Sequence, residues 1–219
     1  MKQVDSEHYD FNRYCGKDRW ASYYYQIKET LKLDPDNILE IGVGDGVFGS
    51  YIKHVHIPYV SVDVAEDLKP DIVGDVLSLP FEDKTFDIVC AFEVLEHLPF
   101  DTFESALKEL KRVSGRHVML SLPHFGPPIL FSLKLPFLPK IEFSFKIPFH
   151  KKHVFDGEHY WEIGKSGYSI KRIRSIIRKH FTIQKEFIPF ENQYHHFFIC
   201  DVEREKRESD SFHISEPRS

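Results

Sequence analysis

Three glycines directly follow a short apolar run in ILEIGVGDGVFGSYI, residues 38–52. Gly42, Gly44 and Gly46 carry no side chain, so the backbone can bend sharply there and a ligand can lie against main-chain N–H groups at the start of a following helix. Glu40 precedes the first glycine by two residues and places a carboxylate near any cationic ligand. The stretch predicts a nucleotide-type ligand site where a strand passes into a helix.

The glycine spacing bears on which nucleotide binds. Residues 44–49, GDGVFG, satisfy the G-x-G-x-x-G pattern of dinucleotide-binding enzymes. In those enzymes the first glycine directly follows the strand, whereas here that glycine is Gly42, so the register disfavours a nicotinamide dinucleotide. No G-x-x-x-x-G-K-[ST] occurs in this region, which argues against a P-loop nucleotide hydrolase.

Short apolar runs alternate with helical or turn segments around this loop, a pattern typical of parallel strands joined by crossover helices. We expect strands at residues 37–42, 58–63, 71–75, 86–92 and 116–122. A helix at 101–113 should cover one face, and a helix at 18–33 should pack through Trp20, Tyr24, Ile27 and Leu31. The pattern predicts an α/β fold with a doubly wound, Rossmann-like sheet.

The rest of the chain completes this sheet. A helix at 169–181 precedes two further strands, 181–189 and 195–202, which a short polar turn joins as an antiparallel hairpin at the sheet edge. We expect one domain over residues 1–202, followed by a polar, disordered tail at 203–219. Its parts are an N-terminal helical cap (1–35), a cofactor-binding core (36–123), an insertion or lid with the acceptor region (124–168), and the final helix and strand pair (169–202).

The motif order resembles that of the class I S-adenosylmethionine-dependent methyltransferases, of the type 11-like kind. The matching elements are EIGVGDG, the acidic strand end at Asp63, the Gly74-Asp75-Val76 step and FEVLEHL at 92–98, each at the carboxyl end of an expected strand. The resemblance spans about residues 36–123. It implies the seven-stranded, mainly parallel methyltransferase fold, and S-adenosyl-L-methionine as the cofactor, with S-adenosyl-L-homocysteine as the product.

The resemblance also implies residue roles. Gly42, Gly44 and Gly46 would form the turn under the methionine part of the cofactor, Glu40 would order this loop and the ammonium end, and Asp63 would accept both ribose hydroxyls.

On the adenine side, Asp75 would accept the amino group and Val76 would pack on the ring, while the backbone around Phe92 and Glu93 would face the methionine moiety. Carboxylates, carbonyls and an apolar wall suffice for such a ligand without a metal.

The insertion is rich in proline and phenylalanine. Its phenylalanines recur every six residues, at 125, 131, 137, 143, 149 and 155, and in an extended chain this spacing places the rings on one face. A lid over the active site is the preferred interpretation, with a membrane-contacting loop as the alternative. HYWEIG, residues 159–164, resembles a segment of superfamily members that modify saccharides or small metabolites, so we expect a small-molecule or saccharide-type acceptor. The same segment could instead be an aromatic plug.

Methyl transfer needs alignment first and a general base only if the acceptor must lose a proton. His124 and His159 are the candidate catalytic residues, ahead of His97 and Tyr160. No histidine pair stands four residues apart with a supporting carboxylate, so no metal site is expected.

Aromatic and cationic residues near the N-terminus could close the ligand site from its other side, or merely pack an added helix. They are Tyr9, Arg13, Tyr14, Arg19 and Trp20.

Composition limits the partners. The net charge of -5 over 219 residues lacks the basic field of non-specific nucleic-acid binding, and the three cysteines lack the spacing of a disulfide framework or a zinc site. No uninterrupted run of 18 apolar residues occurs, so we expect a cytoplasmic chain with no transmembrane segment, and a homodimer is also possible.

Two alternatives to a methyltransferase remain, a nicotinamide-dependent oxidoreductase and a non-catalytic cofactor-binding subunit. The acceptor, and whether its O, N or C atom is methylated, stay undecided.

Overall fold

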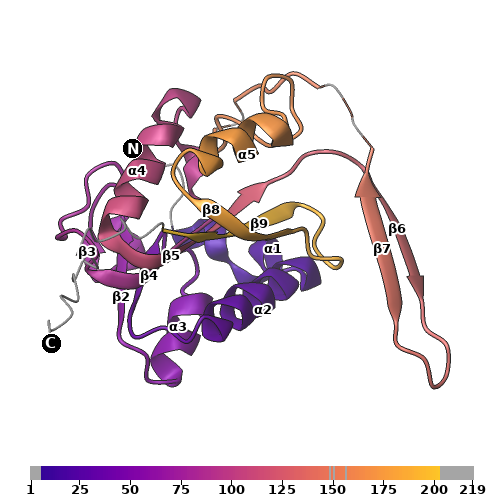
Figure 1. Ribbon diagram of the computed structural model, residues 1–219, viewed down its shortest axis with the longest axis horizontal. Coiled ribbons are helices and arrows are strands. Elements are labelled where there is room, and N and C mark those ends of the chain that lie inside the picture. Colours follow the sequence, from indigo (N-terminus) through magenta and orange to yellow (C-terminus); the bar gives the residue numbers. More distant parts are fainter. Residues whose placement is uncertain (1–5, 148, 150, 156, 203–219) are drawn as a thin grey trace, which may run out of the picture.

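A seven-stranded sheet in the order β3-β2-β1-β4-β5-β9-β8 forms the centre of the molecule (Figure 1). The computed structural model describes residues 6–147, 149, 151–155 and 157–202, so the expected tail at 203–219 lies outside the described residues. The parallel strands are β1 (Ile38–Ile41), β2 (Tyr59–Asp63), β3 (Ile72–Val73), β4 (Phe86–Phe92) and β5 (Ser114–Pro123). β9 (His195–Asp201) is antiparallel to both β5 and β8 (Thr182–Phe187). The predicted fold class and the C-terminal antiparallel pair are confirmed.

Helices cover both faces of this sheet (Figure 1). α4 (Phe103–Val113) and α5 (Ile170–Arg178) pack on one face, and α2 (Lys17–Lys32) and α3 (Val47–His54) pack on the other. Short elements complete the described chain: η1 (Ser6–Tyr9), α1 (Phe11–Tyr14), η2 (Glu66–Leu68), η3 (Leu95–His97) and η4 (Phe100–Thr102).

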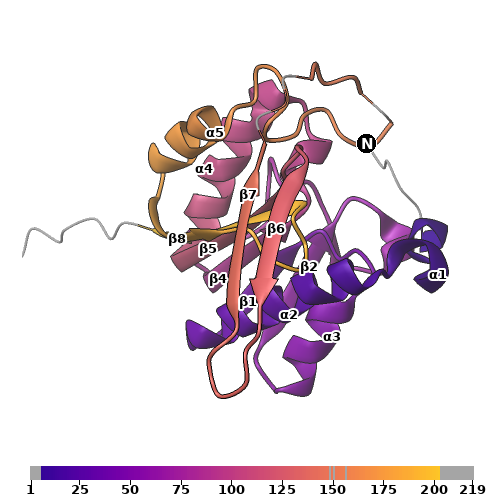
Figure 2. The same cartoon turned by 90° about the vertical axis from the view of Figure 1, so that its right-hand side faces the viewer.

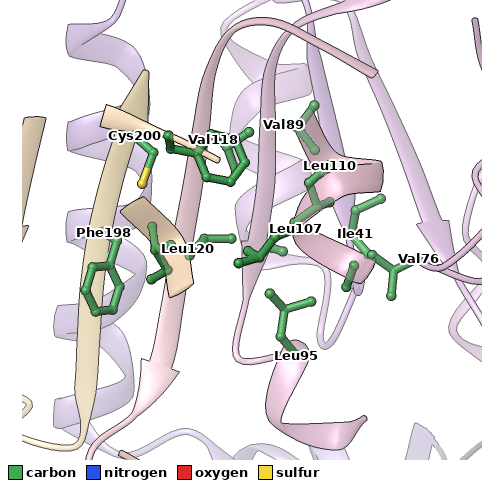
Figure 3. Packing of buried hydrophobic residues seen from close by; sticks show 14 of the residues in the cluster. Ile41, Val76, Val89, Leu95, Leu107, Leu110, Val118, Leu120, Phe198 and Cys200 are labelled. Atoms are coloured by element: carbon green, nitrogen blue, oxygen red, sulfur yellow. The ribbon is translucent and has the colours of Figure 1, made fainter. Parts of the chain in front are cut away.

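The alternation of side chains along each strand divides the core into two clusters. In β4, Val89 and Ala91 face α4 and α5, while Ile88, Cys90 and Phe92 face α2 and α3. Figure 3 shows the first cluster, where Leu107 and Leu110 of α4 lie over strand residues. Because both faces are buried, the central strands read as continuous apolar runs, which explains why they could be recognised in the sequence.

The buried face of α2 differs from the expected one. Ile27 and Leu31 pack on the sheet as expected, but Trp20 is 47% exposed and Tyr24 is 55% exposed. The buried residues of the helix are Ser22, Tyr23, Gln26, Glu29 and Thr30. Polar partners satisfy this face, since Thr30 donates to the Met119 sulfur at 3.2 Å and Glu29 accepts from two lysines. Hydrogen-bond partners that are distant in the sequence therefore determine which face of α2 is buried, rather than the row of apolar residues alone.

The insertion contains a separate two-stranded sheet, β6 (Pro128–Leu133) and β7 (Ile141–Lys146), which projects from the body (Figures 1 and 2). The register pairs Ile129 with Phe145, Phe131 with Phe143 and Leu133 with Ile141. Directly opposed residues share one face, so these six apolar side chains form a single exposed apolar face. The shared face that the phenylalanine spacing predicted is therefore present for Phe131 and Phe143.

Within the described residues, no helix is long and apolar enough to cross a membrane.

Candidate functional site

A cavity of about 350 Å³ opens at the carboxyl ends of β1, β2 and β4. The sheet order changes direction between β1 and β4, and ligands of open α/β sheets bind at such a switch point. Seven of the nine predicted cofactor residues line this cavity: Gly42, Gly44, Asp63, Asp75, Val76, Phe92 and Glu93. Glu40 and Gly46 lie outside its lining.

The glycine loop connects β1 to α3. Its glycines are required for two different reasons, steric space and backbone conformation. Gly42 has φ of 80°, and a Cβ atom on it would clash with Cγ2 of Val94. Gly44 and Gly46 also have positive φ, but a Cβ on Gly46 would meet no atom within 4 Å. Gly46 is the N-cap of α3, so its requirement is conformational, whereas Gly42 must also admit the chain that follows β4.

Asp63 ends β2 and holds the glycine loop in place. Its Oδ2 accepts the Val43 N–H at 2.8 Å and its Oδ1 accepts the Ala65 N–H at 2.8 Å. Each carboxylate oxygen has a second lone pair, so Asp63 can still accept two hydroxyl groups from a ligand. The position fits the predicted ribose contact.

Asp75 and Val76 follow β3 on the adjacent part of the wall. The Asp75 Oδ1 accepts the Leu77 N–H at 2.9 Å, which fixes the carboxylate at the cavity. Val76 is buried and belongs to the main core cluster. The pair presents an acceptor beside an apolar surface, as an adenine ring requires.

Phe92 and Glu93 form the wall at the end of β4. Phe92 packs edge to face on Phe48, with ring centroids 5.3 Å apart. Glu93 has φ of 54°, in the left-handed region where non-glycine residues are uncommon, and its N–H donates to Ser121 at 3.0 Å. Burial raises the pKa of Glu93 to about 7, against the opposing effect of Arg19. The strained backbone aims this carboxyl group at the cavity.

Glu40 lies beneath the loop. Glu40 belongs to the central strand β1, where it is buried and accepts a hydrogen bond from the Tyr59 hydroxyl. Burial raises the pKa of Glu40 to about 8. Its position fits the loop-ordering role, and a direct ligand contact is not part of the arrangement.

N-terminal residues close the cavity from the other side. Tyr9 and Tyr14 line it, and the Arg19 guanidinium stacks over the Tyr14 ring at 4.3 Å. Trp20 instead packs on Tyr23. The side chain of Arg13 lies outside the described residues.

The four histidine and tyrosine candidates separate into two groups. His97 and Tyr160 line the cavity, and the His159 ring lies against the His97 ring with centroids 4.9 Å apart. His124 lines a different hollow, beside Phe125 and Lys146, and its Nδ1 lies 2.9 Å from Nδ1 of His196. Burial lowers the pKa of His124 to about 3. The structure therefore does not bring His124 to the cavity.

The segment after the hairpin is both plug and wall. Trp161 is fully buried against Phe103 and donates its indole N–H to the Leu98 carbonyl at 3.2 Å. The adjacent Tyr160 lines the cavity, and its N–H donates to the Glu96 carbonyl at 2.9 Å. Trp161 therefore fits the aromatic plug, while Tyr160 borders the cavity.

Sequence reasoning missed the apolar part of the lining. Further apolar residues also line the cavity: Leu68 at the end of η2, and Val94, Leu98 and Pro99 in the segment on either side of η3. Their residue types are those of ordinary core positions, so the sequence holds no signal that separates them from the core. Only the positions of Val94 and Leu98 within FEVLEHL could have indicated a place in the lining.

Comparisons with known proteins agree with this geometry. Residues 39–119 match the family model described as methyltransferase domain. An uncharacterised protein of Methanocaldococcus jannaschii is 33% identical over 81 residues, a match that spans 35% of this chain and 35% of that protein.

Solved structures share the fold across most of the chain. A protein of Pyrococcus horikoshii (PH0226) superposes with a TM-score of 0.59 at 15% identity, covering 91% of this chain and 100% of that one. An S-adenosylmethionine-dependent methyltransferase of Clostridium acetobutylicum gives 0.58 at 9% identity, covering 90% and 96%. The 1,6-didemethyltoxoflavin-N1-methyltransferase of Burkholderia thailandensis gives 0.57 at 14% identity, covering 90% and 84%. Residues 39–119 are thus similar to a methyltransferase domain, and the chain as a whole shares its fold with these solved structures.

Proposed function

We propose that this chain binds S-adenosyl-L-methionine in the cavity at the carboxyl edge and transfers the methyl group to a small-molecule acceptor. The observation that carries the proposal is the convergence of Asp63, Asp75 and Glu93, from three different strand ends, on one cavity beside the glycine loop. Three acidic groups around one concave site favour a ligand with hydroxyls, an amino group and a positive charge.

Asp63 and Asp75 would divide the recognition of the nucleoside. The Asp63 oxygens already accept the Val43 and Ala65 N–H groups, which holds the carboxylate still for two ribose hydroxyls. Asp75 accepts the adenine amino group and Val76 packs against the ring. Bound S-adenosylmethionine supplies a sulfonium methyl that an acceptor can attack in line, so the main task of these residues is orientation.

The acceptor would enter on the side of the aromatic residues. Tyr9 and Tyr14 from the N-terminus, and Tyr160 from the segment after the hairpin, surround that part of the cavity. They exclude water and provide flat apolar surfaces with hydroxyl groups at their ends, which suits a polar ring such as a sugar or a small metabolite. His97 lines the cavity and its ring lies against the His159 ring, whereas His124 lines a different hollow.

Titration calorimetry tests the cofactor assignment. Wild-type protein is titrated with S-adenosylmethionine, S-adenosylhomocysteine and NADH, and the expected result is micromolar binding of the first two only, equivalent to about -8 kcal/mol. Asp63→Asn should weaken binding about 10–100-fold, because it removes charged hydrogen bonds of about 1.5–3 kcal/mol.

The matched control is Asp83→Asn, which removes an exposed carboxylate that pairs with Arg112 at 3.0 Å; neither residue lines the cavity. It should bind like the wild type. Binding of NADH alone would support the oxidoreductase alternative, and equal affinity of Asp63→Asn and wild type would reject the assigned site. Cofactor binding without methylation of any acceptor would favour the non-catalytic subunit.

A further inference from the structure

Two histidines and a glutamate meet at the wall of the cavity. Glu96 and His97 lie in η3, directly after β4, and His159 comes from the segment that follows the hairpin. One ligand atom from each residue lies within 4.8 Å of the other two. The Glu96 Oε1 is 4.0 Å from Nε2 of His97 and 4.0 Å from Nε2 of His159.

The Glu96 carboxyl group has no hydrogen-bond partner for either oxygen among the described residues, although its side chain is 0% exposed. A buried carboxylate without partners is costly, because it loses its hydration and gains nothing in return. The Oε1 atom lies 4.0 Å from each imidazole, which is too long for a hydrogen bond. A cation between the three side chains would satisfy this carboxylate.

Each imidazole has a polar group beside its other nitrogen. Nδ1 of His97 lies 3.0 Å from the Glu158 carbonyl oxygen, so it carries the proton and donates, and the Nε2 atom is on the side of Glu96. Nδ1 of His159 lies 3.5 Å from the Tyr194 hydroxyl and 3.7 Å from the Glu162 carboxylate. A polar partner behind the ring is common around metal-binding histidines.

The three ligand atoms would have to move closer together to hold a cation. Nitrogen and oxygen ligands lie about 2.0–2.2 Å from a first-row divalent metal, so ligand atoms of a tetrahedral site lie about 3.3–3.6 Å apart. The two 4.0 Å separations would therefore shorten by about half an ångström. The third pair of ligand atoms, which lies within 4.8 Å, would close by up to about 1.5 Å.

We propose that Glu96, His97 and His159 bind a divalent first-row transition metal, of the Zn²⁺, Mn²⁺ or Fe²⁺ type, at the wall of the cavity. Two imidazoles and one carboxylate form a ligand set that such cations prefer over Mg²⁺ or Ca²⁺. Three protein ligands also leave coordination positions for a substrate. His97 and Tyr160, the residue next to His159, line the cavity, so the proposed site borders it.

A metal at this site would favour acceptors that are methylated on oxygen. This inference about the acceptor rests on the proposed methyltransferase function. A metal-bound hydroxyl group has a lowered pKa and loses its proton to solvent at neutral pH. The resulting oxygen attacks the sulfonium methyl, the O–CH₃ bond forms, and the S–CH₃ bond breaks with its electron pair remaining on sulfur as the neutral thioether. The acceptor is then an alcohol or phenol that is methylated on oxygen, and His159 is a metal ligand rather than the base.

Metal binding is tested on chelator-treated, dialysed protein by calorimetry with MnCl₂, ZnCl₂ and MgCl₂. We expect one Mn²⁺ or Zn²⁺ per chain, weaker binding of Mg²⁺, and a higher melting temperature with the bound ion. Glu96→Gln keeps the side-chain volume and should weaken binding by more than about 100-fold, the upper end of what partners outside the ligand shell contribute. His159→Gln should weaken metal binding by a similar factor. With two variants, the test remains decisive if one of them fails to fold.

The matched control is Glu104→Gln, which alters a glutamate paired with His180 at 3.2 Å on the surface of α4. This variant should bind the metal like the wild type. Absence of Mn²⁺ and Zn²⁺ binding by the wild type, or unchanged affinity in Glu96→Gln and His159→Gln, would overturn the proposal.

S-Adenosylmethionine binding, measured on the same metal-free protein, separates this proposal from the function on which its acceptor step rests. Cofactor binding without metal binding rejects the metal site alone. Metal binding without cofactor binding rejects the methyltransferase function and leaves the metal site intact.

Discussion

Aromatic side chains have opposite environments in the cavity region and in the β6–β7 hairpin. Around the cavity, Phe92 packs on Phe48 and Phe103 packs on Trp161, and all four are buried. In the hairpin, Phe131 and Phe143 oppose each other in register and both remain exposed. Buried aromatic pairs stabilise the folded chain. Exposed aromatic pairs leave apolar surface that is accessible to another molecule.

The two regions also differ in how far along the chain their contacts reach. The hairpin pairs residues of neighbouring strands through its own register, and its strands make no extensive contact with other described elements. The cavity joins side chains from three strand ends and the N-terminus. Substitutions in the β6–β7 hairpin should therefore have little effect on the stability of the main sheet. The cavity, in contrast, keeps its shape only when the whole sheet is folded.

The largest effect should follow from removing a buried ring of the cavity region. Phe103 is 0% exposed and contacts Trp161 with ring centroids 4.8 Å apart. Phe103→Ala should lower the free energy of unfolding by about 3–5 kcal/mol, because it removes apolar area and leaves a void. Thermal unfolding followed by circular dichroism measures this loss. A change below about 1 kcal/mol would mean that the plug is not part of the core.

The glycine loop should distinguish steric from conformational requirements. Gly42→Ala introduces a Cβ against Val94 as well as a positive φ, whereas Gly46→Ala introduces only the positive φ. We expect about 3–4 kcal/mol of destabilisation for the first and about 1–2 kcal/mol for the second. Urea unfolding of the two variants gives both values. Equal values would show that the approach of Val94 is not limiting.

The buried Glu40 should make stability fall with rising pH. Its pKa of about 8 lies above the ordinary value of 4.5, so the native state holds a proton that the unfolded state releases between these values. This contribution is complete below about pH 4.5 and is lost as the pH rises through about 8. In this window the melting temperature of the wild type should fall, relative to Glu40→Gln, by about 3–5 °C per pH unit. Parallel pH profiles of the two proteins would exclude the raised pKa.

The smallest effect is expected at the tip of the hairpin. Phe137 is fully exposed between β6 and β7, so Phe137→Ala should change the free energy of unfolding by less than about 0.5 kcal/mol. It is the counterpart of Phe103→Ala in the same thermal assay. A loss comparable to that of Phe103→Ala would show that the hairpin packs on the body in solution.

Deletion of residues 131–145 tests the lid interpretation of the same region. None of the hairpin strand residues lines the cavity, so cofactor affinity should not change. Loss of acceptor turnover in this variant would support a lid that closes only with substrate, and unchanged turnover would reject it.

The sequence alone was sufficient to predict the seven-stranded sheet and seven of the residues that line the cavity. The central strands are buried on both faces, and their apolar runs end at Gly42, Asp63 and Glu93. Since strand ends of a parallel sheet meet at one edge, linear order was enough to bring these residues together.

Tertiary structure decided what linear order could not encode. His159 is 62 positions after His97 and meets it only because the segment after the hairpin folds back over η3, so a search for paired ligands four residues apart could not find the cluster with Glu96. His124 directly follows β5, yet it pairs with His196 of the antiparallel β9 and lines a different hollow from the cavity. α2 buries Thr30 and Glu29 because partners from β5 and β8 satisfy them. In each case the deciding contact joins residues far apart in the chain, and its energy depends on burial and partners that exist only after folding.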